Sequence, residues 1–172
     1  MSSHQASDVA GTAGAIEFEA VTKRYPVPAG GRGDAPSAVE SFSARLPAGS
    51  TTVLLGSSGC GKTTLLRMVN CMVDPTRGQV LLDGRDVRDR DPVALRRSIG
   101  YVMQNGGLLP HRRVIDNITL VPRLCETDRA TARRRAHELM EMLGLDGDLA
   151  GRYPHQLSGG QAQRVGVARA LA

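Results

Sequence analysis

The sequence predicts an α/β fold, and two observations support that prediction. Short apolar runs of strand length alternate with helical segments from residue 16 to residue 172. One of these runs, residues 51–55, leads through a glycine-rich loop at residues 56–63 into a helical segment. Strand, glycine-rich turn and helix in this order are typical of the phosphate-binding edge of a parallel sheet covered by helices. We therefore expect a core of parallel strands and helices.

The segment before this core has the pattern of an antiparallel unit. Residues 1–15 are rich in Ser, Ala and Gly, and we expect a disordered tail there. Residues 16–20 alternate apolar and charged side chains, which predicts a half-buried strand leading to Tyr25. A Pro/Gly-rich loop at 26–37 separates it from a second alternating run at 38–46. Two such strands favour an antiparallel unit in front of the glycine-rich loop.

The glycine-rich loop reads GSSGCGKT and matches the phosphate-binding pattern GxxxxGK[ST]. Its glycines let main-chain N–H groups approach an anion, and the helix that follows adds a positive partial charge. Lys62 would reach the β- and γ-phosphates, and the Thr63 hydroxyl would bind Mg²⁺. A chance glycine-rich turn is the competing interpretation. The expected phosphate contacts are Gly56, Ser57, Ser58, Gly59, Cys60, Gly61, Lys62, Thr63 and Thr64.

The middle of the chain continues the alternation. Residues 79–82 predict a strand, and Asp83-Gly84 is a hairpin signal. Asp91 is a suitable N-cap for a short helix that begins at Pro92. Residues 99–103 then predict a further strand.

Helices dominate the part of the chain after a loop at residues 106–113. Residues 114–125 predict a helix disturbed by Pro122. Thr127 is a suitable cap for the next helix, which Gly144 would end. Its apolar face would be formed by Ala136, Leu139, Met140 and Leu143.

A second glycine-rich motif precedes the last helix. It comprises Leu157, Ser158, Gly159, Gly160 and Gln161. Ser158 is a plausible N-cap, and the two glycines would expose N–H groups at a helix N-terminus. The motif can therefore be interpreted as a second anion cradle, or as a capped glycine-rich turn.

Composition and charge exclude several classes of function. The net charge is +5 with a pI near 9.6, but the arginines are scattered and only three Tyr and two Phe could stack on bases. We therefore expect no nucleic-acid partner. Three cysteines without CxxC spacing predict neither a disulfide framework nor a zinc site. Without an apolar run of about 20 residues or a secretion signal, a cytoplasmic location is expected.

The two glycine-rich motifs together resemble the ATP-binding subunits of ABC transporters, whose signature is LSGGQ. The resemblance covers residues 16–172 and is greatest to importers of glycine betaine, carnitine and choline. It implies an ATPase core, here residues 16–104, with an antiparallel β subdomain. A mainly helical subdomain would span residues 105–157 and the signature helix residues 158–172.

The resemblance also implies roles for single residues. Tyr25 matches the aromatic residue that stacks on adenine, although a packed strand residue is the alternative. Gln104 matches the glutamine that approaches Mg²⁺ and the attacking water, although an ordinary polar residue at a strand end is the alternative. Residues 106–117 would meet the membrane-embedded partner. Lys62, Gln104 and Ser158 are thus the expected catalytic residues.

The implied function is an ATP-binding subunit that drives uptake of a quaternary amine osmoprotectant. Two copies would close head to tail around ATP and Mg²⁺ at the cytoplasmic face of the membrane, bound to permease subunits and indirectly to a solute receptor. The chain departs from the family in lacking the Asp-Glu strand and switch histidine after the signature. We therefore expect it to be C-terminally incomplete and inactive alone. A soluble, non-transport ABC ATPase and a nucleotide-binding fragment without turnover are the alternatives.

Overall fold

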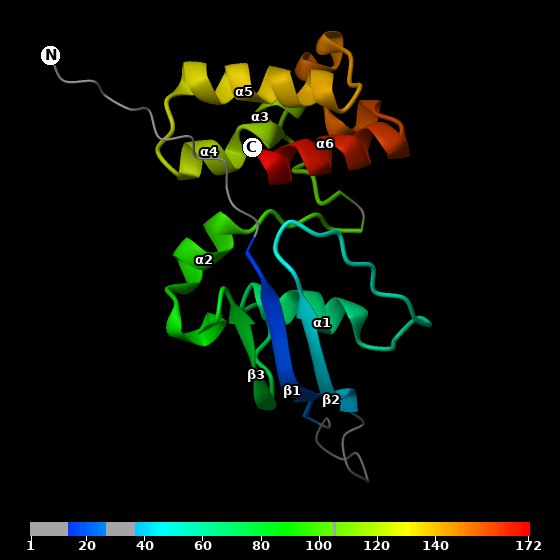
Figure 1. The fold of residues 1–172 in the computed structure, drawn as a ribbon. Helices are drawn as coiled ribbons and strands as arrows, with labels where there is room; N and C mark the ends of the chain where they lie inside the picture. The colour runs from blue at the N-terminus through cyan, green and yellow to red at the C-terminus, as the bar shows by residue number, and fades with distance from the viewer. Residues whose placement is uncertain (1–13, 27–36, 105) are drawn as a thin grey trace, which may run out of the picture. The chain divides into compact units, whose positions relative to one another are not determined.

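The computed structural model describes residues 14–26, 37–104 and 106–172, and the chain forms two compact units that divide after Leu95 (Figure 1). Most of the expected tail at residues 1–15 and most of the loop at 26–37 lie outside the described residues. Those two expectations therefore stay predictions.

The first unit is a four-stranded antiparallel sheet with a helix packed on it (Figure 1). The strand order is β2-β1-β3-β4, and helix α1 (Lys62–Val69) contacts β2 and β3. Phe18 and Val80 of the sheet and Met68 of α1 are among the side chains buried in the unit. The strands are β1 (Ile16–Arg24), β2 (Ser37–Leu46), β3 (Arg77–Leu82) and β4 (Arg85–Asp86).

Two local predictions are confirmed at the end of this unit. Asp83 and Gly84 connect β3 to β4 with positive φ angles of 54° and 71°, as a tight hairpin turn requires. The Asp91 carboxylate accepts a hydrogen bond of 2.7 Å from the Ala94 N–H at the start of helix α2 (Pro92–Ser98). A short 3₁₀ turn, η1 (Val87–Asp89), precedes this helix.

The second unit is helical, with one apolar core (Figure 1). Helix α6 contacts both α3 and α5, and Val165 of α6 is buried among Ile118, Leu139 and Met140. The helices are α3 (Val114–Ile118), α4 (Leu120–Leu124), α5 (Arg129–Met142) and α6 (Gly159–Leu171), with 3₁₀ turns η2 (Gly147–Gly151) and η3 (Pro154–Gln156). Gly144 ends α5 with a φ of 61°, as predicted.

Two helix predictions are wrong in detail. The helix expected over residues 114–125 is broken at Thr119, and Pro122 lies inside the first turn of α4, where a missing N–H is tolerated. The α5 cap is Asp128 and not Thr127, because the Asp128 carboxylate accepts from the N–H groups of both Ala130 and Thr131 at 3.0 Å.

The α/β class is confirmed, but two of the predicted strands are not formed. Residues 51–55 and 99–103 have no strand conformation, and the sheet of the described residues is antiparallel throughout. A strand needs a hydrogen-bonding neighbour, and within the described part of the chain no strand pairs with either segment. Val53 and Leu55 consequently have 70% and 88% of their surface exposed. No helix of the described residues combines the length and apolarity needed to span a membrane.

Candidate functional site

The glycine-rich loop of the first unit is built around the start of α1. Gly61 is the N-cap of α1 with a φ of 92°, and its carbonyl accepts from the Leu65 N–H at 2.9 Å. A Cβ at residue 61 would lie 2.3 Å from the Ala38 carbonyl oxygen of β2, so only glycine fits this close approach. The N–H groups of the first helical turn have no partner within the helix. The loop therefore presents backbone donors at a helix N-terminus.

The Lys62 ammonium donates its hydrogen bonds within the loop itself. Nζ donates to the carbonyl oxygens of Gly56 and Ser57 at 2.7 Å each and lies 3.4 Å from the Cys60 sulfur. A Cβ at Gly59 would meet nothing within 4 Å, and Thr63 is exposed. The surface of the loop is thus open to an anion. To bind the Lys62 ammonium, the anion must replace the two carbonyl oxygens that accept its hydrogen bonds.

A hollow of about 460 Å³ adjoins this loop within the first unit. Val39 and Phe42 of β2 and Leu65 of α1 line one part of it, and Gly59, Cys60 and Lys62 line another. Its polar end is therefore the candidate phosphate site, while its apolar part is formed by the sheet and α1.

Tyr25 lies directly after β1, with 45% of its surface exposed. The Lys23 ammonium is 5.2 Å from the centre of its ring, and the same ammonium donates to the Asp74 carbonyl at 2.7 Å. Both interpretations of Tyr25, a stacking residue and a packed strand residue, therefore stay predictions. The ring is available for stacking against a planar ligand.

The second glycine-rich motif forms the N-terminus of α6, as predicted. Ser158 Oγ accepts from the Gln161 N–H at 3.2 Å, and the Ser158 N–H donates to Gln161 Oε1 at 2.9 Å. This reciprocal capping box orients the turn, while the partly buried Leu157 packs against the helical core. Gly159 and Gly160 are exposed, and a Cβ at either would meet nothing within 4 Å. Contacts among the described residues do not require glycine at these two positions.

Gln104 is exposed and begins a turn in the second unit. The carbonyls of Gly106 and Gly107, which follow it, accept hydrogen bonds of 3.0 and 2.8 Å from the Arg169 guanidinium of α6. Partial burial lowers the pKa of Arg169, because desolvation disfavours the charged form. The glutamine and the second glycine-rich motif are therefore connected through α6.

A buried asparagine organises the next loop along the chain. Asn117 is fully buried, and its Oδ1 accepts from the Leu109 N–H at 2.8 Å. Its Nδ2 lies 3.2 Å from the Leu109 carbonyl and 3.1 Å from those of Arg112 and Arg113. His111 is exposed at the tip of the loop that these bonds hold.

Sequence reasoning did not identify Arg169 or Asn117. The partners of both residues are backbone groups, which the sequence pattern does not reveal. The Gly106-Gly107 pair was the available signal, because consecutive glycines indicate an unusual backbone conformation, here with φ angles of 69° and 58°.

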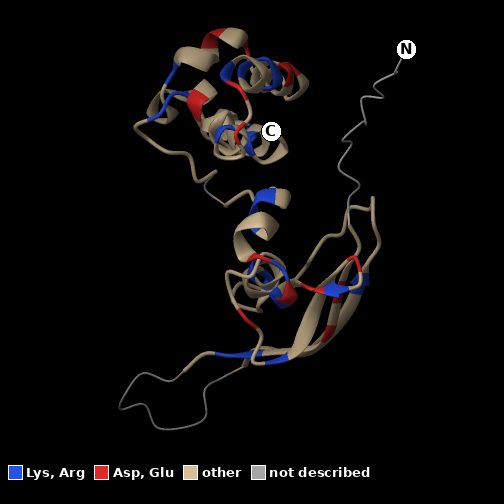
Figure 2. Cartoon of the chain, turned by 90° about the vertical axis from the view of Figure 1, so that its left-hand side faces the viewer, with Lys and Arg blue, Asp and Glu red and all other residues tan. Residues whose placement is uncertain are grey.

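Metal-binding side chains and the distribution of charge can be described for residues 14–26, 37–104 and 106–172. No group of three or more His, Cys, Asp or Glu side chains with metal-binding geometry occurs among the described residues. Figure 2 shows Lys and Arg interspersed with Asp and Glu on both units. Lys62 and Tyr25 belong to the first unit and Gln104 and Ser158 to the second, so the candidate residues form two separate sets.

Comparison with known proteins identifies relatives. The family model described as ABC transporter matches residues 39–172. The osmoprotectant import ATP-binding protein OsmV of Salmonella typhimurium is 46% identical over 158 residues, which are 91% of this chain and 41% of OsmV. The carnitine transport ATP-binding protein OpuCA of Listeria monocytogenes is 43% identical over 91% of this chain and 38% of its own length. The chain thus spans about two fifths of these relatives.

A solved structure matches as well. The dimeric ATP-binding cassette MJ0796, in a post-hydrolysis state bound to ADP and Pi, superposes with a TM-score of 0.79 at 34% identity. The match covers 91% of this chain and 69% of that one.

Proposed function

Because the chain belongs to the ABC transporter family of ATP-binding proteins, we propose that it is the nucleotide-binding part of an import subunit that couples ATP hydrolysis to solute uptake. The observation that carries this proposal is the open pair Gly159 and Gly160 at the capped N-terminus of α6. Glycine is not required there by the described residues. A ligand held by a second copy would explain the two glycines, since a phosphate can approach a helix N-terminus closely where no Cβ atoms stand in the way.

The loop residues fit ATP with Mg²⁺. The Lys62 ammonium would exchange the carbonyls of Gly56 and Ser57 for the β- and γ-phosphate oxygens, and backbone N–H groups of residues 57–64 would surround the phosphates. Thr63 and Gln104 would hold Mg²⁺, which supplies charge neutralisation during phosphoryl transfer. Tyr25 would stack on the adenine ring.

Hydrolysis transfers the γ-phosphoryl group to water. Lys62 of one subunit would stabilise the negative charge that develops on the phosphoryl oxygens, and the Ser158 hydroxyl and Gly160 N–H of the second subunit would do the same. Gln104 would orient the attacking water. Each composite site therefore needs two copies placed head to tail, and the dimeric state of the cassette MJ0796 supports the presence of two copies by analogy.

The similarity to osmoprotectant and carnitine import proteins supports a quaternary amine such as glycine betaine as the transported solute. We place the subunit at the cytoplasmic face of the membrane, bound to permease subunits and coupled through them to a solute receptor. The loop braced by Asn117, with His111 at its tip, is the proposed permease contact.

The test uses the complete subunit and two variants, Lys62→Ala and Ser158→Arg. Lys62→Ala should weaken ATP binding by the monomer, whereas Ser158→Arg monomers should bind ATP normally and fail in dimer closure and turnover. A mixture of the two variants should recover at most one of the two composite sites. Loss of monomer ATP affinity in Ser158→Arg as severe as in Lys62→Ala would contradict the proposal.

A further inference from the structure

The backbone at Gly106 and Gly107 lies against one face of α6. Ala162, Gly166 and Arg169 are spaced at i, i+4 and i+7, so they share that face. A Cβ at Gly166 would lie 3.0 Å from the Gly106 carbonyl oxygen, and a Cβ at Gly106 would lie 3.2 Å from that of Ala162. The small residues Ala162 and Gly166 thus allow the backbone at Gly106 to approach α6 closely. Arg169 lies on the same face, one turn further along the helix.

Arg169 completes this contact with charge-assisted hydrogen bonds. Its two terminal nitrogens donate to the adjacent carbonyls of Gly107 and Gly106. Both glycines have left-handed backbone conformations, which other residues adopt at a cost. No carboxylate among residues 14–26, 37–104 and 106–172 forms an ion pair with Arg169, so these carbonyls are its compensation for partial burial.

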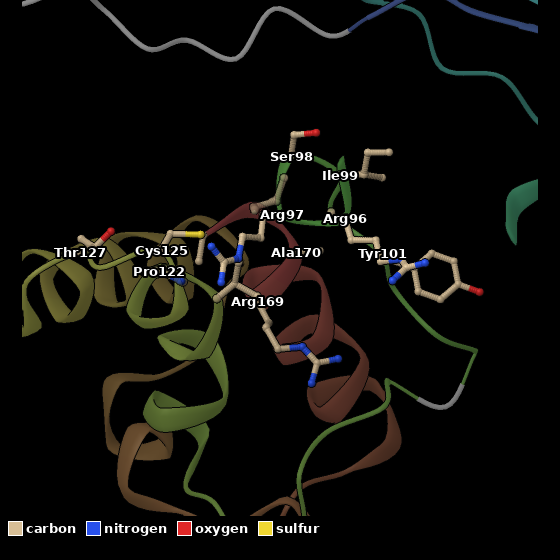
Figure 3. A pocket seen from close by; sticks show the side chains of 14 residues that line it. Arg96, Arg97, Ser98, Ile99, Tyr101, Pro122, Cys125, Thr127, Arg169 and Ala170 are labelled. Atoms are coloured by element: carbon tan, nitrogen blue, oxygen red, sulfur yellow. The ribbon is translucent and has the colours of Figure 1, made fainter. Parts of the chain in front are cut away.

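The direction of the side chain agrees with this role. Arg169 is one of the residues around a cavity of about 260 Å³ in the second unit, together with Ile99 and Tyr101. Figure 3 shows its side chain lying along α6 and pointing away from Ser98 and Ile99. The guanidinium therefore holds the backbone at Gly106 and Gly107.

We propose that Arg169 is a positioning residue for Gln104, which it couples to Ser158 through α6. Ser158 begins the helix and Arg169 lies 11 residues further on, about 16 Å along the axis. A rigid helix with Gly106 and Gly107 fixed to it makes the glutamine and the signature serine move together. The inference rests on the proposed function, because it assigns Gln104 and Ser158 to the ATP site.

A double-mutant cycle in the complete subunit tests the coupling. Arg169→Met keeps the length of the side chain but removes its donors, and the turnover rate should fall by about 10²-fold, as misplacement of a positioned group can cause. ATP affinity should change by less than about twofold. In a Gln104→Ala background the same substitution should slow turnover by no more than about twofold, because its target is gone. Equal losses in both backgrounds, or no loss in either, would overturn the proposal.

Gly166→Ala is the second variant. It raises helix propensity and leaves the charge intact, yet its methyl group presses on the Gly106 carbonyl. Slower turnover of Gly166→Ala without a lower melting temperature would support the proposal, and this result can be obtained even if Arg169→Met does not fold. Unchanged turnover of Gly166→Ala would contradict the proposal. Arg133→Met, which removes an exposed arginine of α5, is the control and should behave like the parent.

Hydrogen exchange separates this proposal from the proposed function. The Gly106 N–H donates to the Met103 carbonyl at 2.9 Å, and its exchange should accelerate in Arg169→Met while that of the α5 core does not. Faster exchange in a subunit without Lys62-dependent hydrolysis would confirm that Arg169 holds Gly106 and Gly107, and it would refute the ATPase. Unchanged exchange in an active subunit would refute only the proposed role of Arg169.

Discussion

Gly61→Ala should destabilise the chain by more than a glycine substitution two residues earlier. Gly61 and Gly59 both have left-handed backbones, with φ angles of 92° and 82°. An alanine at either position costs about 1–2 kcal/mol in backbone conformation. At Gly61 the new Cβ would also lie 2.3 Å from the Ala38 carbonyl and 2.9 Å from Val39 Cγ2, whereas at Gly59 it would meet nothing within 4 Å.

Comparing Gly61→Ala with Gly59→Ala isolates the cost of the overlap between the new methyl group and β2. Forcing an extra methyl group against packed backbone typically costs about 1–3 kcal/mol. We therefore expect a loss of about 2–5 kcal/mol in the free energy of unfolding for Gly61→Ala and about 1–2 kcal/mol for Gly59→Ala. Both substitutions also restrict the unfolded chain, which offsets part of each loss about equally.

Urea unfolding followed by circular dichroism measures the difference. With a slope of about 1–3 kcal/mol per molar urea, the midpoints of the two variants should differ by roughly 1 M. Equal midpoints would refute the reasoning, because they would mean that the approach of α1 to β2 is not tight. A change in slope would show that the unfolded or native state had changed in compactness.

Three further predictions concern ATP binding and pH. Lys62→Ala should weaken Mg-ATP binding to the complete subunit by about 1.5–3 kcal/mol in calorimetry, which is the contribution of a hydrogen bond to a charged group. The control Arg67→Ala, on the exposed part of α1, should leave the affinity unchanged. Tyr25→Ala should weaken ATP and GTP about equally, by about 1–2 kcal/mol, since stacking tolerates any base, and a loss confined to ATP would indicate hydrogen-bond recognition instead. The Thr131 and Ala130 hydrogen bonds hold the pKa of Asp128 below its ordinary 3.8, so the stability it contributes is present above that value and is lost as the pH falls through the lowered pKa. Asp128→Asn should keep the cap and reduce this acid dependence in thermal melts from pH 5 to pH 2, and an unchanged pH profile would exclude Asp128 as its source.

Features that depend on neighbours in sequence were predicted well. Asp91 and Ser158 cap the helices that follow them, and Asp83-Gly84 turns the chain between β3 and β4. Each of these bonds spans three residues or fewer, so the pattern contains both partners. The Asp128 cap was missed because Thr127 and Asp128 are both good caps, and which of them lies at the boundary depends on how α5 packs.

Features that depend on distant partners were not predicted. Arg169 donates to carbonyls more than 60 residues earlier in the chain. The partners of Asn117 are nearer in sequence, but they are also backbone groups. Any residue can supply a backbone carbonyl, so the sequence does not indicate which one a side chain will meet. Such residues emerge only when burial and hydrogen bonds are known.

The unformed strand at residues 51–55 explains why Gly61 matters. An apolar run indicates how a segment behaves once it is paired, but a parallel strand obtains its partners through long connections. Among the described residues no strand pairs with this run, so it cannot hold the phosphate loop that comes after it. The loop is instead anchored from the other side, where Leu65, Met68 and Val69 of α1 are buried and Gly61 lies against Ala38. A substitution at Gly61 should therefore affect the loop more than one at the exposed Val53.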